Sequence, residues 1–338
     1  MRFQNVSIVG VAHVDAPLRI TSAELDDRLA STYARIGVQA GLLEGLSGIV
    51  ARRFWDEGVQ PSDAATLAAE KVLADTGIDR SKIGILVNTS VCRDYIEPST
   101  ACLVHGNLKL SPECMNFDVS NACLGFINGM KIVGNMIERG QVDYAIVVDG
   151  EGSRFVIEKT LERLLAPDAD EQLFRDSFAT MTLGSGAAAM ILARSDLVPG
   201  GHKFLGGVDL AGTEHNRLCM GQPDWMRTRT GELLVAGLGL ANKTWQKGKD
   251  ELGWSSDHFD ELVLHQVSRV HTERLVGLLG LDLDKVLAIY PEFGNIGPAS
   301  VPIVLSKAVE AGRVVAGKKV ALMGIGSGLN VSMAELVW

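Results

Sequence analysis

The stretch Leu183-Gly184-Ser185-Gly186 recurs near the end of the chain as Ile325-Gly326-Ser327-Gly328, and an apolar run typical of a buried strand follows each copy. Because glycine has no side chain, such a turn lets backbone N–H groups approach a ligand closely. A dinucleotide-binding loop does not explain the second copy, since that loop precedes a helix and this copy precedes a strand. Repetition of the turn and strand instead indicates an internal duplication.

Two further pairs of segments match in the same order. Residues 85–88 resemble residues 262–265, and the strand before Asn121 resembles the strand before Asn295. Chance similarity between short apolar strands is the alternative, but three ordered matches favour two related halves, at about 1–195 and 196–338. The Gly-Ser-Gly copies are closer together than the other pairs, which predicts an insertion in the first half at about 151–180. Its charged, helix-prone part is interpreted as a cap or channel wall.

Short runs of Val, Ile and Leu alternate with longer segments of helical period, which is the pattern of an α/β protein with buried strands. A helix is expected after Cys123, with one apolar face and with Gly140 at its C-terminal end. That face consists of Phe126, Met130, Val133 and Ile137. Strands are predicted at residues 6–11, 83–88, 116–121, 144–149, 262–265, 286–290 and 320–323.

Composition excludes several classes of protein. With 46% hydrophobic and 22% charged residues, the chain has enough apolar material for a large core. A net charge of -9 makes nucleic acid an unexpected partner, because phosphate binding needs a clustered basic surface. No apolar stretch reaches the roughly 20 residues of a membrane span, and the N-terminus does not resemble a signal peptide, so we expect a cytoplasmic protein. Five cysteines without C-x-x-C spacing predict reduced thiols and no metal site.

Cys123 lies between a predicted strand and a predicted helix, in Asn121-Ala122-Cys123-Leu124-Gly125. Unpaired N–H groups and the dipole at a helix N-terminus stabilise a thiolate, which predicts a nucleophile at neutral pH. The alternative is a small core residue, which is the commoner role of cysteine. The position at a strand-to-helix turn favours the nucleophile.

His265 and Asn295 follow predicted strands in the second half of the chain. The carboxyl ends of strands are where α/β sheets place ligand-binding and catalytic groups. Taken alone, His265 has the alternative of a polar residue satisfied by its neighbours, and Asn295 that of a turn residue in a glycine-rich loop.

Together these motifs resemble the thiolase superfamily, and specifically the ketoacyl synthase III-like condensing enzymes. The resemblance rests on the Cys123 turn, His265-Gln266, residues 294–302 and the closing Gly326-Ser327-Gly328. It implies an α/β fold of duplicated βαβαβαββ halves in a five-layer αβαβα sandwich, and a homodimer. Cys123 would be the acylated nucleophile, and His265 with Asn295 would hydrogen-bond the carbonyl oxygen of the second thioester.

A second oxyanion hole would use the backbone N–H groups of Cys123 and Ser327, with Gly326 and Gly328 forming the substrate loop. Ketoacyl synthase III enzymes generally have glycine where this chain has Ser327. A backbone donor survives that difference, so the expected role is unchanged.

The segment from Arg93 to Thr100 resembles the OleA family of acyl-CoA condensing enzymes of olefin biosynthesis. The resemblance implies head-to-head condensation of two fatty acyl-CoA molecules without decarboxylation, giving a 2-alkyl-3-oxoalkanoic acid. Glu97 would remove the α-proton, and in the family this glutamate reaches the site of the neighbouring subunit. A simpler interpretation is a glutamate that complements a helix dipole, since Pro98 is expected to open a helix. Cys219 does not match the motif of the second thiolase cysteine.

Two alternative reactions remain. A ketoacyl synthase III would decarboxylate malonyl thioester and would need no base, and a Cys-His-Asn hydrolase would only cleave a thioester. No cofactor is expected besides acyl-CoA as substrate, and downstream enzymes of the pathway are possible partners. Arg52, Arg53 and Lys243 are expected to be solvated surface charges rather than contacts to CoA phosphates.

Overall fold

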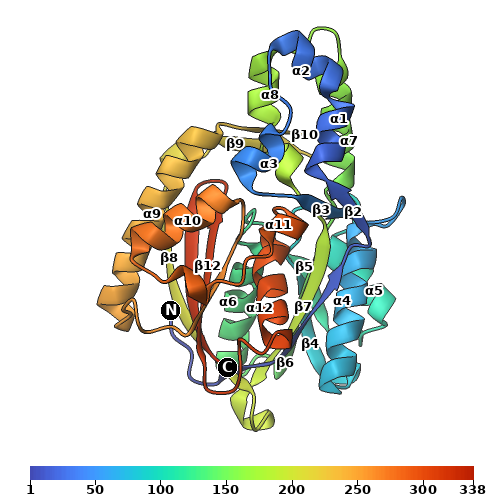
Figure 1. The fold of residues 1–338 in the computed structure, drawn as a ribbon. Coiled ribbons are helices and arrows are strands. Elements are labelled where there is room, and N and C mark those ends of the chain that lie inside the picture. The colour runs from blue at the N-terminus through green and yellow to red at the C-terminus, as the bar shows by residue number, and fades with distance from the viewer.

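The computed structural model describes residues 1–338, and its centre is one nine-stranded sheet (Figure 1). The strand order is β11-β12-β13-β8-β1-β7-β6-β4-β5. The strands are β1 (Val6–Asp15), β4 (Ile83–Asn88), β5 (Met115–Asp118), β6 (Tyr144–Glu151), β7 (Gly186–Arg194), β8 (His202–Ala211), β11 (Glu261–Leu264), β12 (Lys319–Gly326) and β13 (Asn330–Val337).

The sheet has the same pattern of pairing on both sides of the junction between β1 and β8. That junction is short, since only Ser7 and Ile8 pair across it. Outward from it, β7 and β13 are antiparallel to the next strands, β6 and β12, which are parallel to β4 and β11. This arrangement is the duplicated fold expected from the sequence. The boundary between halves near residue 195 stays a prediction.

Helices cover the sheet in layers. Between its two halves lie α6 (Gly125–Glu138) and α12 (Ser300–Glu310), whose apolar side chains share one core cluster with both halves. The outer face of the first half is covered by α4 (Pro61–Thr76) and α5 (Thr100–Leu108). The outer face of the second half is covered by α9 (Thr230–Leu252) and α10 (Arg269–Leu279). The result is the predicted αβαβα sandwich.

The helix predicted after Cys123 is α6, and its expected apolar face is confirmed. Phe126, Met130, Val133 and Ile137 are all fully buried, so the helical period places them against the central core. Gly140 has a φ of 68° and ends the helix as predicted, because glycine adopts this left-handed conformation without a steric penalty.

The strand predicted at residues 286–290 is wrong. No strand forms there, and α11 (Tyr290–Phe293) begins where the strand was expected to end. The side-chain amide of Gln266 forms hydrogen bonds with this backbone that a neighbouring strand would otherwise form. Its Oε1 accepts from the N–H groups of Ile289 and Tyr290, at 2.8 and 3.0 Å, and its Nε2 donates to Leu287 O at 2.7 Å. The backbone is thus satisfied without a ladder.

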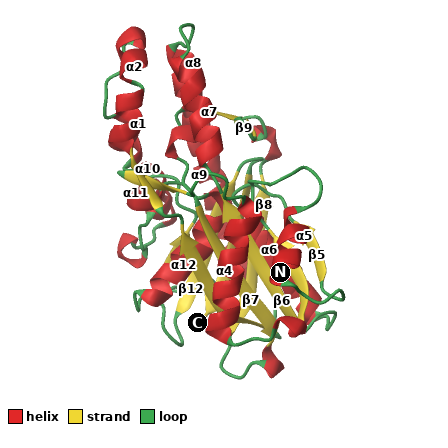
Figure 2. Cartoon of the chain, turned by 90° about the vertical axis from the view of Figure 1, so that its right-hand side faces the viewer, coloured by secondary structure: helices red, strands yellow, loops and turns green.

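A group of short helices rises above the carboxyl ends of the strands (Figures 1 and 2). The predicted insertion contains α7 (Arg154–Leu165) and α8 (Glu171–Ser177). The helices α7 and α8 pack on an N-terminal segment, and together they form a cap above the sheet. The sequence did not predict that the N-terminal segment belongs to this cap. The segment and the two helices share a separate core that includes Leu25, Tyr33, Leu161 and Phe174. That segment comprises β2 (Leu18–Thr21), α1 (Ser22–Arg28), α2 (Ala30–Ile36), α3 (Leu42–Ser47) and β3 (Ala51–Phe54).

A hairpin of β9 (Cys219–Gln222) and β10 (Trp225–Thr228) lies between β8 and α9 in the chain and packs against α7 and α8 of the cap. Thr180 Oγ1 donates to Met226 O at 3.2 Å, which ties the hairpin to the segment after α8. None of the helices combines the length and apolarity needed to cross a bilayer.

Candidate active site

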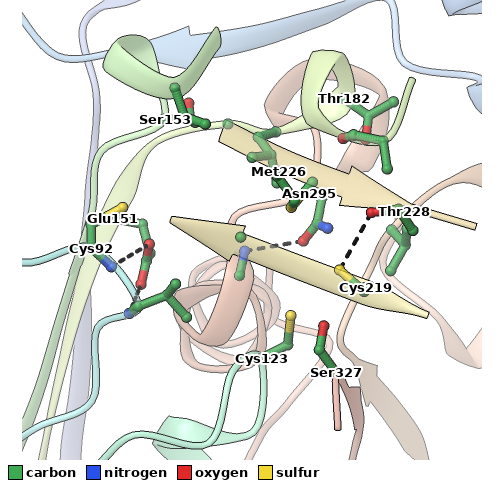
Figure 3. Close-up of a pocket in the computed structure, with 18 of the residues that line it drawn as sticks. Cys92, Cys123, Glu151, Ser153, Thr182, Cys219, Met226, Thr228, Asn295 and Ser327 are labelled. Atoms are coloured by element: carbon green, nitrogen blue, oxygen red, sulfur yellow. Dashed lines mark hydrogen bonds between the residues drawn. The ribbon is translucent and has the colours of Figure 1, made fainter. Parts of the chain in front are cut away.

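A cavity of about 2280 Å³ lies between the cap and the carboxyl ends of the strands. Cys123, His265, Asn295 and Ser327 all line it, although they come from four separate segments of the chain. Figure 3 shows the Cys123 sulfur and the Ser327 side chain directed toward the space in which Asn295 lies. The structure therefore brings together four of the five side chains that the sequence singled out.

Cys123 lies in a tight turn between β5 and α6. Ala122 before it has a φ of 45°, an uncommon conformation for a residue other than glycine. Gly125 after it lies so close to the end of β4 that a Cβ atom would be 2.4 Å from Thr89 O. Glycine is required at this contact, because it lets the turn bring the thiol to the edge of the sheet.

The Cys123 thiol is not stabilised as a thiolate in this structure, contrary to the prediction. Burial raises its pKa to about 12, and the neighbouring Cys219 and Glu151 add to the effect. Removing the thiol from water disfavours the charged form, and two adjacent groups that become anionic oppose it further. The resting nucleophile is therefore a thiol, and its proton must leave as a thioester is attacked.

His265 and Asn295 form a hydrogen-bonded pair. Asn295 Oδ1 accepts from Gly297 N–H at 3.0 Å and lies 3.0 Å from His265 Nε2, so the proton of the imidazole is on Nε2. Burial lowers the pKa of His265 to about 4, which keeps the ring neutral. In this structure the Nε2–H group of His265 donates to Asn295 Oδ1, so it becomes a donor to a substrate oxygen only by turning from that contact, whereas Asn295 Nδ2 can donate without such a change.

Ser327 follows β12 in the closing Gly-Ser-Gly turn. Gly326 packs on the nucleophile turn, since a Cβ atom there would be 3.1 Å from Leu124 Cγ and 3.3 Å from Asn121 O. The backbone N–H groups of Cys123 and Ser327 donate to no other backbone oxygen in the chain. Two unused donors beside the sulfur are what an oxyanion hole requires.

Glu97 is the exception, because the structure does not place it in the cavity of its own chain. It lies on the loop between β4 and α5, exposed, next to Tyr95 and Ile96, whose exposed fractions are 59% and 97%. The expectation that Pro98 opens the helix is wrong: α5 begins at Thr100, and Ser99 Oγ caps it by accepting from Cys102 N–H. The helix-dipole interpretation of Glu97 loses its basis with that shift.

Sequence reasoning missed two carboxylates at the end of β6. Asp149 and Glu151 are buried, and Glu151 lines the cavity. Burial raises the pKa of Glu151 to about 7 and the pKa of Asp149 well above its usual range. The available signal was two acidic residues, two positions apart, at the end of an apolar strand, where both side chains face one side of the sheet.

Further sequence interpretations concern four residues, Cys219 and the basic residues Arg52, Arg53 and Lys243. Cys219 lines the cavity on β9 and accepts from Thr228 Oγ1 at 3.3 Å, although it lacks the thiolase motif (Figure 3). Arg52 is fully buried, donating to Ser22 Oγ at 3.0 Å, so its assignment to the surface is wrong. Arg53 is half-buried and lies over the Phe293 ring, whereas Lys243 is exposed as expected.

Comparison with known proteins identifies the class first. Residues 117–207 match the 3-oxoacyl-[acyl-carrier-protein] synthase III model, and residues 250–338 match the model of its C-terminal part. With the layered fold, these matches define a thiolase-fold condensing enzyme.

Full-length relatives identify the family. The chain is 56% identical to the acyl-CoA:acyl-CoA alkyltransferase of Xanthomonas campestris and 36% identical to that of Shewanella oneidensis, with all of each chain covered. A crystal structure of Xanthomonas campestris OleA superposes with a TM-score of 0.98 over 100% of this chain and 98% of that one. A cysteine-to-serine variant of that protein, with bound lauric acid and lauroyl-CoA, matches with the same TM-score over 99% of this chain and 100% of that one. The chain belongs to the OleA family.

Proposed function

We propose that this protein joins two long-chain fatty acyl-CoA molecules head to head, by a Claisen condensation without decarboxylation, to form a 2-alkyl-3-oxoalkanoic acid. The product would enter long-chain olefin biosynthesis. The observation that carries the proposal is the convergence of Cys123, His265, Asn295 and Ser327 on one cavity in a chain of the OleA family. The bound lauroyl-CoA of the Xanthomonas campestris variant supports acyl-CoA as the substrate.

The first step is acyl transfer to Cys123. The sulfur attacks the thioester carbonyl, the thiol proton leaves with the CoA sulfur, and CoA departs as a free thiol. The tetrahedral oxyanion accepts hydrogen bonds from the N–H groups of Cys123 and Ser327. Because the resting thiol has a raised pKa, these donors act on the charge that develops during attack.

The second step is formation of a carbon nucleophile. A carboxylate removes the α-proton of a second acyl-CoA, and the enolate oxygen accepts hydrogen bonds from His265 Nε2 and Asn295 Nδ2. The α-carbon then attacks the acyl-Cys123 carbonyl and expels the sulfur, which recovers its proton. Hydrolysis of the remaining CoA thioester gives the β-keto acid and a second CoA. The reaction uses two acyl-CoA molecules and water, and needs no cofactor.

Glu97 is the proposed base, supplied by the second subunit of a homodimer. Two features support its placement across an interface. The loop tip carries exposed apolar side chains, and the adjacent β5 is an open sheet edge with Met115 and Phe117 partly exposed. Such edges and patches are normally covered by a partner. In this arrangement each subunit contributes Glu97 to the cavity of the other.

Purified protein and one saturated long-chain acyl-CoA test the reaction. We expect release of CoA and formation of the β-keto acid, or of the ketone that results from its spontaneous decarboxylation. Turnover only with added malonyl thioester would instead identify a ketoacyl synthase III. Free fatty acid as the sole product would identify a hydrolase.

Glu97→Ala separates the two steps. It should leave acylation of Cys123 intact and block condensation, and mixing it with Cys123→Ala protein should restore activity in heterodimers. A heterodimer has one cavity with both Cys123 and Glu97 only if Glu97 acts across the interface, so absence of rescue would place the base elsewhere. We further expect a cytoplasmic enzyme that passes its product to later enzymes of the pathway.

A further inference from the structure

Glu151 contacts the loop that carries Glu97. It is the last residue of β6, it is 6% exposed, and its carboxylate accepts from Val91 N–H at 2.6 Å and from Cys92 N–H at 3.4 Å. Cys92 Sγ also donates to Gly152 O at 3.4 Å. The first residues of the loop are therefore attached to the end of β6 through one carboxylate and its neighbouring backbone (Figure 3).

Glu151 is itself held rigidly from other directions. Trp55 Nε1 donates to Glu151 O at 2.9 Å, and the strand pairing places Glu151 opposite Gly186. On its other side lies Gly297, where a Cβ atom would be 3.5 Å from Glu151 Cδ. Glu151 thus lies between the Glu97 loop and the loop that carries Asn295, and it lines the same cavity as Cys123.

A second attachment holds the middle of the loop. Asp94 accepts from Ser62 Oγ at 2.7 Å and from Ser62 N–H at 3.2 Å, which fixes it to the start of α4. Beyond Asp94 the loop is exposed at Tyr95 and Ile96, which also line the cavity. The loop is therefore held at two places before Glu97, and on its far side the N–H groups of Thr100 and Ala101 donate to Asp118.

We propose that the ionised carboxylate of Glu151 is a positioning group for the condensation step, because it anchors the loop that delivers Glu97 to the partner subunit. This inference rests on the proposed function and adds to it a residue that does not touch the reacting atoms. Hydrogen bonds from N–H groups to a carboxylate are stronger than those to a neutral acid, so protonation of Glu151 loosens the loop. Small displacements of a base are costly, since catalysis depends on near-attack geometry.

The charge state of Glu151 changes near neutrality. The titratable groups that face it are Asp149 on β6, Cys92 on the loop and Cys123 on the turn before α6, and burial raises the pKa of each. Glu151 has a raised pKa of about 7, so it is mostly protonated at pH 6 and mostly ionised at pH 8. The anchor is therefore stronger on the alkaline side.

Glu151→Gln tests the anchor because it mimics the protonated acid. Acylation of Cys123, followed by intact-protein mass, should be no slower than in the wild type, because the change removes a charge that raises the pKa of Cys123, and β-keto acid formation at pH 8 should fall about 10- to 100-fold. The ratio of wild-type to variant condensation rates should approach 1 at pH 6 and rise with a midpoint near 7. Any pH effect that both proteins share cancels in that ratio. A ratio that does not vary with pH, or a variant with the wild-type condensation rate, would overturn the proposal.

Two further variants keep the test decisive. Glu335→Gln makes the same change at a buried glutamate that contacts Trp254 and His258 far from the loop, and it should leave the condensation rate unchanged. If Glu151→Gln fails to fold, Asp94→Asn weakens the other attachment and should reduce condensation alone, without the pH dependence. Normal condensation in Asp94→Asn would then reject loop anchoring. Wild-type protein that makes β-keto acid, with an inactive Glu97→Ala variant, would show that the proposed function stands even if the anchor fails.

Discussion

The two Gly-Ser-Gly turns lie at equivalent places in the two halves of the sheet, and each supports the active-site turn of the other half. Gly184 N–H donates to Asn295 O at 2.8 Å, and Asn295 N–H donates to Thr182 O at 2.9 Å. Gly326 packs on Asn121 and Leu124 around Cys123. The duplication has therefore produced two turns that exchange support across the molecule.

The serines of the two turns differ in environment. Ser185 is fully buried, and its Oγ accepts from Ser153 N–H at 2.9 Å. Both serines line the cavity, but Ser327 is only partly buried. The comparison teaches that one scaffold, used twice, supplies the geometry, while the chemistry comes from the few positions at which the halves differ.

The nucleophile Cys123 is supplied by the first half alone, and its replacement should have the largest effect on turnover. Cys123→Ala should reduce turnover by roughly 1,000-fold or more, because it removes the thiol to which the acyl chain is transferred. Intact-protein mass after incubation with acyl-CoA measures the loss of the acyl adduct. Cys102→Ser, at an exposed thiol, is the matched control and should retain the adduct. An adduct that persists in Cys123→Ala would place the nucleophile at another cysteine, for which Cys219 is in position.

In the second half of the chain, the active-site turn that corresponds to the Cys123 turn carries Asn295. Asn295→Ala removes a donor to the enolate oxygen and should slow condensation by about 100- to 1,000-fold, while Cys123 is still acylated. Acyl-enzyme mass and β-keto acid yield, measured on the same samples, separate the two steps. Equal loss of both would mean that Asn295 serves the whole cavity rather than the second step.

Gly184 and Gly326, the glycines that support the two active-site turns, are expected to differ in how strongly their replacement destabilises the fold. A Cβ atom at Gly184 would be 1.9 Å from Phe293 O, a backbone atom, whereas at Gly326 the nearest atom is a Leu124 side-chain carbon at 3.1 Å. Gly184→Ala should therefore lower the free energy of unfolding by about 3 kcal/mol or more, and Gly326→Ala by about 1 kcal/mol. Thermal unfolding of the two variants under one set of conditions measures the difference. Equal destabilisation would contradict the unequal packing.

Local sequence patterns predicted the parts of the site that depend on local structure. The apolar period of α6, the strands before Cys123 and His265, and the glycine turns all encode their own conformations. The strand at residues 286–290 failed because a distant side chain, Gln266, satisfies its backbone. Properties set by burial were also out of reach, including the raised pKa of Cys123 and Glu151. The proposed role of Glu97 requires a second subunit, and no pattern of local structure in one chain indicates such a contact.

Ser327→Gly makes the smallest chemical change to the second Gly-Ser-Gly turn and should have the smallest effect on turnover. If the backbone N–H of residue 327 is the working donor, removing the hydroxymethyl group leaves it in place, and turnover should stay within about twofold of wild type. Ser327→Pro has no N–H, so it should slow acylation of Cys123 by about 100-fold or more. Single-turnover release of CoA measures both rates. A large loss in Ser327→Gly would mean that the hydroxyl group itself contacts the substrate, a role that the fully buried Ser185, hydrogen-bonded to Ser153, does not share.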